Sequence, residues 1–167
     1  KPFSLVFRVY EDGAAYRFLT TSPGRVNVLD ETVRFRFSGN WYSYFPETPS
    51  FFTHQESEYT HLRFVEIRPA MMSYVPVLVE LEDGACAVIT EADISDYPGL
   101  YLQGTEEFGF DAVFPRYPLE ETMRRDRDVP VTVSAEYLAD TEGTRSFPWR
   151  VLILSEDAGG IVESQMV

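Results

Sequence analysis

Residues 3–19 read FSLVFRVYEDGAAYRFL, and this stretch decides the fold class. Apolar side chains recur at every second position from Phe3 to Val9, the spacing that places side chains on one face of a β-strand. Asp12-Gly13 then supplies a favoured two-residue turn, and residues 14–19 form a returning strand. The stretch therefore predicts an antiparallel β-hairpin.

Short alternating segments recur along the rest of the chain, separated by residues typical of turns. We expect the strand that begins at residue 14 to end at Ser22-Pro23-Gly24, and Asp83-Gly84 to turn a second hairpin. Helix signals are weak: a capped helical turn over 90–97, and a solvated loop or short helix over 118–127. The remaining strands are expected at residues 26–28, 33–37, 75–81, 85–90, 108–114, 129–135 and 149–154.

Strands separated by turns, without intervening helices, predict an all-β fold. We expect an antiparallel β-sandwich that forms a single domain over residues 1–167. Apolar residues make up 44% of the chain and aromatic residues 15%, a composition that supports a packed core and differs from that of a disordered acidic segment.

The charge of the chain limits its partners. There are 27 acidic and 14 basic residues, which gives a formal net charge of −13. Nucleic-acid binding needs a basic surface, and docking on anionic lipid needs the same, so we expect neither partner. No apolar run approaches the roughly 18 residues of a membrane-spanning helix, so we expect no membrane insertion. Acidic side chains do suit calcium, although the charge serves solubility equally well.

Cys86 is the only cysteine, which excludes an internal disulfide and a metal site built on several thiolates. It lies between two alanines in an apolar run, so we expect a buried, unreactive thiol. The strand pattern begins at residue 3 without a signal peptide, and residues 161–167 are still largely apolar. We therefore expect the chain to be a piece of a longer protein.

Two acidic segments are candidates for a metal site. If residues 54–58 are extended, His54, Glu56 and Glu58 share one face and could hold a metal ion; the alternative is an edge strand with polar side chains in water. Residues 90–99 carry three carboxylates that could bind calcium, although their order does not match an EF-hand. The alternative there is a helical turn whose acidic side chains interact with its dipole.

An aromatic loop follows the fourth expected strand. Trp41, Tyr42 and Tyr44 could stack on sugar rings, or they could fill the core or a domain interface. The motifs of a serine-hydrolase elbow, a dinucleotide-binding turn and a P-loop are all missing from the sequence. Paired carboxylates for glycoside hydrolysis could exist among the 27 acids, but their spacing selects no pair.

Four segments, taken in order, carry recognisable motifs. Residues 7–18 read FRVYEDGAAYRF, and Gln55-Glu56 with Tyr59 forms an acidic segment after the aromatic loop. Residues 89–97 read ITEADISDY, and residues 148–154 read PWRVLIL. Together these segments resemble the hairpin, the acidic segment, the EA-x-L-x-DY segment and the PWR strand of the amino-terminal β-sandwich domain of glycoside hydrolase family 97.

The resemblance implies a supersandwich similar to that of galactose mutarotase, packed on a (β/α)-barrel that follows residue 167 and hydrolyses α-glucosides or α-galactosides. It implies a bacterial periplasmic or exported enzyme with calcium in its active site. The sandwich would lend one calcium ligand, at the position of Glu56, with Glu58 as the fallback if the match is offset by two residues. The acid, the base or nucleophile, and the other calcium ligands would belong to the barrel, so we expect this segment alone to be inactive.

The resemblance also implies further strands before the first hairpin. A sandwich without them would expose unpaired strand edges. Our first hypothesis is therefore a non-catalytic domain that braces the barrel of a glycosidase acting on oligosaccharides. Two alternatives stay open: a stand-alone carbohydrate-binding module that uses Trp41, Tyr42 and Tyr44, and a structural domain without a ligand.

Overall fold

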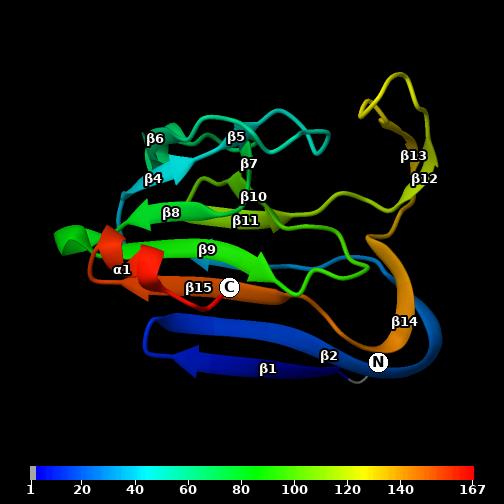
Figure 1. Ribbon diagram of the computed structural model, residues 1–167, viewed down its shortest axis with the longest axis horizontal. Helices are drawn as coiled ribbons and strands as arrows, with labels where there is room; N and C mark the ends of the chain where they lie inside the picture. The colour runs from blue at the N-terminus through cyan, green and yellow to red at the C-terminus, as the bar shows by residue number, and fades with distance from the viewer. Residues whose placement is uncertain (1–2) are drawn as a thin grey trace.

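The computed structural model describes residues 3–167, which form two packed antiparallel sheets and a projecting hairpin (Figure 1). This confirms the all-β sandwich. The larger sheet has the strand order β1-β2-β15-β9-β8-β4-β6, and β14 pairs with the distal part of β2. Its strands are β1 (Phe3–Tyr10), β2 (Gly13–Val28), β4 (Tyr42–Phe45), β6 (Thr60–Arg63), β8 (Val77–Glu80), β9 (Cys86–Ala92), β14 (Ala139–Ser146) and β15 (Trp149–Ser155).

The smaller sheet has the strand order β3-β11-β10-β7-β5, and β12 and β13 form the separate hairpin that projects from the body in Figure 1. A short helix, α1 (Ala158–Glu163), follows the last strand. No helix within residues 3–167 is long and apolar enough to cross a membrane. The strands are β3 (Arg34–Arg36), β5 (Glu47–Thr48), β7 (Met72–Tyr74), β10 (Tyr101–Gly104), β11 (Gly109–Val113), β12 (Pro118–Glu121) and β13 (Val131–Ser134).

The main core lies between the two sheets. Phe45, Val79 and Ile89 of the larger sheet and Leu102 and Phe110 of the smaller one are fully buried in one cluster. These side chains sit at the alternating positions of their strands, as the period of two requires. The sandwich core therefore follows directly from the sequence pattern.

A second cluster covers part of the outer face of the larger sheet. Val88 of β9 and Val151 and Ile153 of β15 pack there, with Ile161 of α1 and Met166 against them. In Figure 1, α1 lies in front of β9 and β15. Both faces of the central strands are thus buried, while the outer face of β4 is left open, since Tyr42 and Tyr44 are exposed.

The first hairpin forms as expected, with its turn one residue earlier. Tyr10 pairs with Gly13, so Glu11 and Asp12 make the turn. Gly13 is needed for another reason: a Cβ atom at this position would lie 2.2 Å from the carbonyl oxygen of Leu152. The glycine thus permits the close approach of β15.

The expectation that Ser22-Pro23-Gly24 ends a strand is wrong, because β2 continues to Val28. Gly24 adopts a φ of +67°, and the register with β14 shifts between Glu142 and Thr144. A left-handed glycine and a β-bulge let the strand bend without ending. The bend lies within the part of β2 that pairs with β14, since the pairing with β15 ends at Tyr16 and the pairing with β14 begins at Leu19.

Neither segment with a weak helix signal forms a helix, although residues 122–127 are the exposed loop that was the other expectation for residues 118–127. The segment 90–97 continues β9 to Ala92 and then forms an irregular loop, in which Asp93 and Asp96 have φ values of +59° and +52°. The segment 118–127 begins with β12, which pairs with β13 and is exposed throughout. It has no apolar face to hold a helix on the body, so pairing of the two strands decides its structure.

The edge of the larger sheet is apolar. Phe3, Leu5, Phe7 and Val9 lie on one face of the edge strand β1, with exposed fractions of 65%, 43%, 63% and 79%. Cys86 is buried as expected, and burial raises the pKa of its thiol, which keeps the thiol protonated and unreactive.

Candidate functional site

The loop that carries Glu56 connects β5 to β6 and is fixed by two tyrosine hydroxyls of the smaller sheet. Tyr74 accepts a hydrogen bond from the Ser57 N–H at 2.8 Å and donates one to the Ser57 carbonyl at 3.1 Å. The Gln55 side-chain amide donates to the Tyr101 hydroxyl at 3.3 Å. Both tyrosines are more than nine-tenths buried, so the residues on either side of Glu56 are attached to the rigid sheet.

The metal site expected within this loop does not form from the chain alone. Gln55 has a φ of +57°, which interrupts the extended backbone that would place His54, Glu56 and Glu58 on one face. All three side chains are exposed, and residues 3–167 contain no group of three His, Cys, Asp or Glu side chains that could hold a metal. The residues on either side of Glu56 are therefore held by the sheet, while Glu56 itself is exposed.

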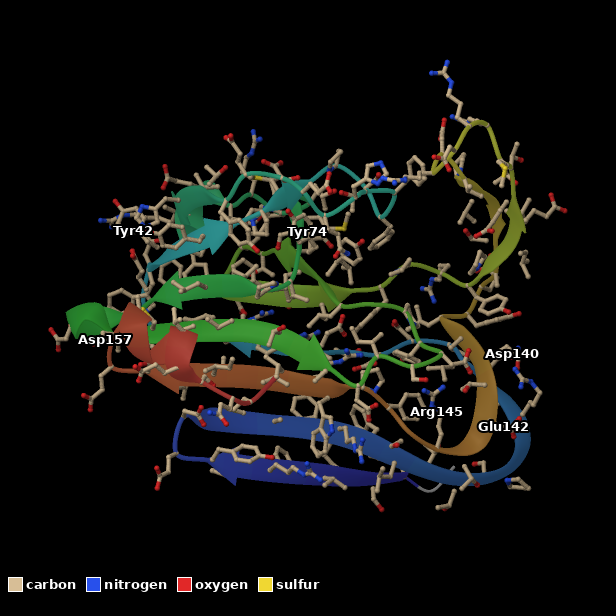
Figure 2. All side chains as sticks on the ribbon, viewed as in Figure 1. Tyr42, Tyr74, Asp140, Glu142, Arg145 and Asp157 are labelled. Carbon is tan, nitrogen blue, oxygen red and sulfur yellow. The ribbon has the colours of Figure 1, made fainter. Side chains whose placement is uncertain are left out.

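In the second acidic segment, all three carboxylates contact arginines, two of which lie on β2 and β14. Arg17 of β2 donates to Asp93 at 2.9 Å. Arg145 of β14 lies 3.9 Å from the Asp96 carboxylate and donates to its carbonyl at 3.0 Å. Figure 2 shows Arg145 beside this loop. Residues 3–167 contain no group of three acidic side chains that could hold a metal, so the three carboxylates of residues 90–99 do not form the calcium site that the sequence suggested.

The third carboxylate, Glu91, belongs to a buried ion-pair cluster. Arg150 donates to both oxygens of Glu31 at 2.8 Å and to Glu91 at 2.6 Å. The other oxygen of Glu91 accepts from the Leu100 N–H at 2.7 Å. The side chains of Arg150, Glu31 and Glu91 are 1%, 7% and 5% exposed. The cluster satisfies its polar groups, as a buried charge requires.

Burial and the neighbouring charges shift the pKa values of Glu91 and Arg150 in opposite directions. Desolvation raises the pKa of Glu91, and the Leu100 N–H and the Arg150 charge only partly offset it. The two carboxylates raise the pKa of Arg150 in spite of the desolvation that lowers it. The cluster joins residues far apart in the sequence and was not predicted from it. The available signal was an arginine inside the apolar strand 149–154, which needs carboxylate partners once it is buried.

The aromatic residues in and before β4 differ in exposure. Trp41, which precedes the strand, is partly buried and packs against the main core, whereas Tyr42 and Tyr44 of β4 are 36% and 37% exposed on the outer face. The His61 ring lies between the two tyrosine rings, at centroid distances of 4.4 and 4.6 Å. Figure 2 shows that Tyr42 lies well away from Tyr74, which anchors the Glu56 loop.

Arg63 and Glu80 complete this outer surface. The Arg63 guanidinium lies 4.6 Å from the centre of the Tyr42 ring. Glu80 lies 2.8 Å from His61 Nε2, so the second histidine bonds a carboxylate of β8 and not the Glu56 loop. No sequence motif marks Arg63 or Glu80, because their proximity to Tyr42 depends on strand pairing across β6, β4 and β8.

Comparisons with known proteins find consistent relatives. The family model described as Glycosyl-hydrolase 97 N-terminal matches residues 1–167. The retaining alpha-galactosidase of Bacteroides thetaiotaomicron is 27% identical over 167 residues, which cover 93% of this chain and 25% of that protein. The chain thus spans about a quarter of the length of this curated relative.

Solved structures share the fold. A Glycoside Hydrolase Family 97 enzyme from Pseudoalteromonas sp. strain K8, in complex with acarbose, matches with a TM-score of 0.73 and 17% identity, covering 98% of this chain and 22% of that chain. A beta-arabinopyranosidase matches with a TM-score of 0.64 and 15% identity, covering 93% of this chain and 25% of that chain. At these identities the likeness concerns the fold.

Proposed function

The chain belongs to the Glycosyl-hydrolase 97 N-terminal family, and from this premise we propose that it is the non-catalytic domain of a calcium-dependent α-glycosidase. It would brace a catalytic (β/α)-barrel and lend one calcium ligand to the active site. The parent enzyme would act on an α-galactoside or α-glucoside oligosaccharide, in the periplasm or outside the cell. The name of the retaining alpha-galactosidase relative supports the α-glycosidase activity.

The observation that carries the proposal is the fixed position of Glu56. Two buried tyrosines hold the residues on either side of it, while its own carboxylate has no hydrogen-bond partner within residues 3–167. Calcium takes about six to eight oxygen ligands, so one carboxylate fits as a single ligand and not as a complete site. The remaining ligands would come from the barrel.

In this role the chain positions a carboxylate and does no proton transfer itself. Calcium, when bound, would polarise the reacting groups beside the barrel carboxylates. The Tyr74 and Tyr101 hydroxyls would hold Glu56 at a fixed distance from the sheet, so the ligand would be preorganised when the two domains meet.

The apolar face of β1 supports the bracing role. Four large apolar side chains are exposed in a row, next to the partly buried Tyr16 and Phe18 of β2. Contiguous exposed apolar surface of this kind marks contacts with other polypeptide segments, and the unpaired edge of β1 offers backbone groups for pairing. We expect this face to be covered in the longer protein.

The test is Glu56→Gln in the longer enzyme. Calcium affinity and calcium-dependent hydrolysis should fall, while the melting temperature stays the same. Glu58→Gln is the matched control, because it makes the same change two residues away in the same exposed loop. Full activity of Glu56→Gln at limiting calcium would contradict the proposal, and an effect of Glu58→Gln alone would move the ligand to Glu58.

A second function, a stand-alone carbohydrate-binding module, is favoured by one observation. Tyr42 and Tyr44 are exposed on an open sheet face, beside the partly buried Trp41. Titration of the 167-residue chain with oligosaccharides separates this function from a purely bracing role. Saturable binding without the barrel would support the module.

A further inference from the structure

The outer surface around Tyr42 contains a cavity of about 420 Å³. This volume falls within the range of about 300–1,000 Å³ that is typical of small-molecule sites. We name it the Tyr42 pocket. It is lined by Asn40, Trp41, Tyr42, Arg63, Glu80, Leu81, Gly84, Cys86 and Ala158.

The polar side chains of the pocket are held in place by their neighbours. Tyr42 lies between Arg63 and His61, with the Arg63 guanidinium over its ring and the His61 ring stacked at 4.4 Å. His61 Nε2 in turn orients Glu80 at 2.8 Å. The hydrogen-bonded strands β6, β4 and β8 place these side chains next to one another, so the pocket is preorganised by the sheet.

The pocket presents hydrogen-bonding groups that are free to bind a ligand. Arg63 forms no ion pair within residues 3–167, so its guanidinium can donate outward. Asn40 Oδ1 accepts from the Val65 N–H at 3.1 Å, which leaves the Asn40 amide nitrogen as a donor. One oxygen of Glu80 bonds His61, and the other is left as an acceptor.

These groups select the chemical class of the ligand. An apolar compound would leave Arg63, Glu80 and Asn40 desolvated without partners, at a high cost. An anionic ligand would meet the Glu80 carboxylate on a chain with a net charge of −13. A neutral polyhydroxylated ligand both donates and accepts hydrogen bonds, and its C–H faces suit an aromatic surface.

We propose that the Tyr42 pocket binds a neutral oligosaccharide. Trp41 provides the aromatic surface for one sugar ring, Arg63 and Asn40 donate to its hydroxyls, and Glu80 accepts from them. Tyr42 is a positioning residue. The Arg63 guanidinium and the His61 ring already lie against its ring, so Tyr42 holds Arg63 in place at the pocket. The inference rests on the carbohydrate role proposed above and assigns it to a defined pocket.

The experiment is an NMR titration of the ¹⁵N-labelled 167-residue chain with maltotetraose and, separately, raffinose. We expect saturable shifts at residues 40–42, 63, 80–86 and 158 with at least one of the two sugars. Arg63→Ala should weaken binding about tenfold or more, because it removes a charged hydrogen-bond donor. Arg68→Ala, which removes an exposed arginine that does not line the pocket, is the matched control and should bind normally.

A second variant separates loss of binding from loss of folding. Ala158 is exposed on α1 at the pocket wall, so Ala158→Arg should fill the pocket and abolish binding without a change in melting temperature. Two results would overturn the proposal: no saturable shift up to about 10 mM of either sugar, or binding that Arg63→Ala and Ala158→Arg leave unchanged. Glu56→Gln should not affect this titration, so the pocket and the calcium ligand can fail independently.

Discussion

The two acidic segments of this domain differ in how their carboxylates are used. In residues 90–97, Glu91, Asp93 and Asp96 each contact an arginine from a neighbouring strand. In the loop at residues 53–59, the glutamates at 56 and 58 form no ion pair within residues 3–167, and neighbouring tyrosines bond the chain around them.

The comparison distinguishes carboxylates that are paired within the domain from carboxylates that have no partner in it. Arginines pair with the carboxylates of the first segment, which form no metal-binding group within residues 3–167. The second segment is anchored by fewer and neutral hydrogen bonds, through tyrosine hydroxyls that leave its two carboxylates unpaired within residues 3–167. The proposed calcium ligand would therefore come from the second segment, whose glutamates form no ion pair within residues 3–167.

The largest expected effect comes from removing the cation of the buried cluster. Arg150→Met leaves Glu31 and Glu91 buried without a counter-ion, which should cost about 3–5 kcal/mol of unfolding free energy. Urea denaturation measures it. Arg68→Met, an exposed arginine, should change stability by less than about 0.5 kcal/mol. If the two variants lost equal unfolding free energy, the ion pairs of Arg150 with Glu31 and Glu91 would not be what stabilises residues 90–97.

The next effect concerns Glu91 itself and depends on pH. Burial raises the pKa of Glu91 in the folded chain, so the folded chain binds this proton more tightly than the unfolded chain. The resulting stabilisation is present below the ordinary glutamate pKa and is lost as the pH rises through the raised value. Glu91→Gln should cost about 1.5–3 kcal/mol through the lost Arg150 bond and should remove this pH dependence.

Denaturation of wild type and Glu91→Gln between pH 4 and 8 provides the measurement. The stability difference between the two proteins isolates Glu91 from the other carboxylates, many of which respond to pH in the opposite direction. A difference that stays constant over the whole range would refute the raised pKa.

A smaller effect is expected where the Glu56 loop joins the sheet. Tyr74→Phe removes the hydroxyl that bonds both the N–H and the carbonyl of Ser57, at a cost of about 1 kcal/mol. Amide hydrogen exchange at Ser57 should become faster. Tyr59→Phe removes one hydroxyl bond, 3.3 Å long, to the Pro76 carbonyl and should have less effect. Unchanged exchange at Ser57 in Tyr74→Phe would mean that the loop is held by other contacts.

The strands and the core could be predicted from the sequence because both depend on local alternation. The hairpin of residues 3–19 and the strands of the main core follow from a period of two. The bend at Gly24 could not be predicted, because a tight turn and a bulged strand use the same residues. The same limit applies to residues 118–121, where pairing with β13 overrides a weak helix propensity.

The candidate sites show a similar division. The position of Glu56 was accessible through its motif, whereas its fixation by Tyr74 and Tyr101 required the fold. The pairing of Arg150 with Glu31 spans 119 residues of sequence, and no local pattern reports such a contact. For the same reason, Arg63 and Glu80 could not be joined to Tyr42 before the strand register was known.

The smallest expected loss of stability, for Glu56→Gln, is the sharpest test of the difference between the two acidic segments. Glu56→Gln makes the same chemical change as Glu91→Gln, but at a side chain that is exposed and has no hydrogen-bond partner within residues 3–167. We expect the unfolding free energy of the 167-residue chain to change by less than about 0.5 kcal/mol. Urea denaturation of the two variants side by side gives the result. A loss at Glu56 as large as the loss at Glu91 would mean that Glu56 stabilises this domain by itself, and the reason to assign its carboxylate to a partner domain would disappear.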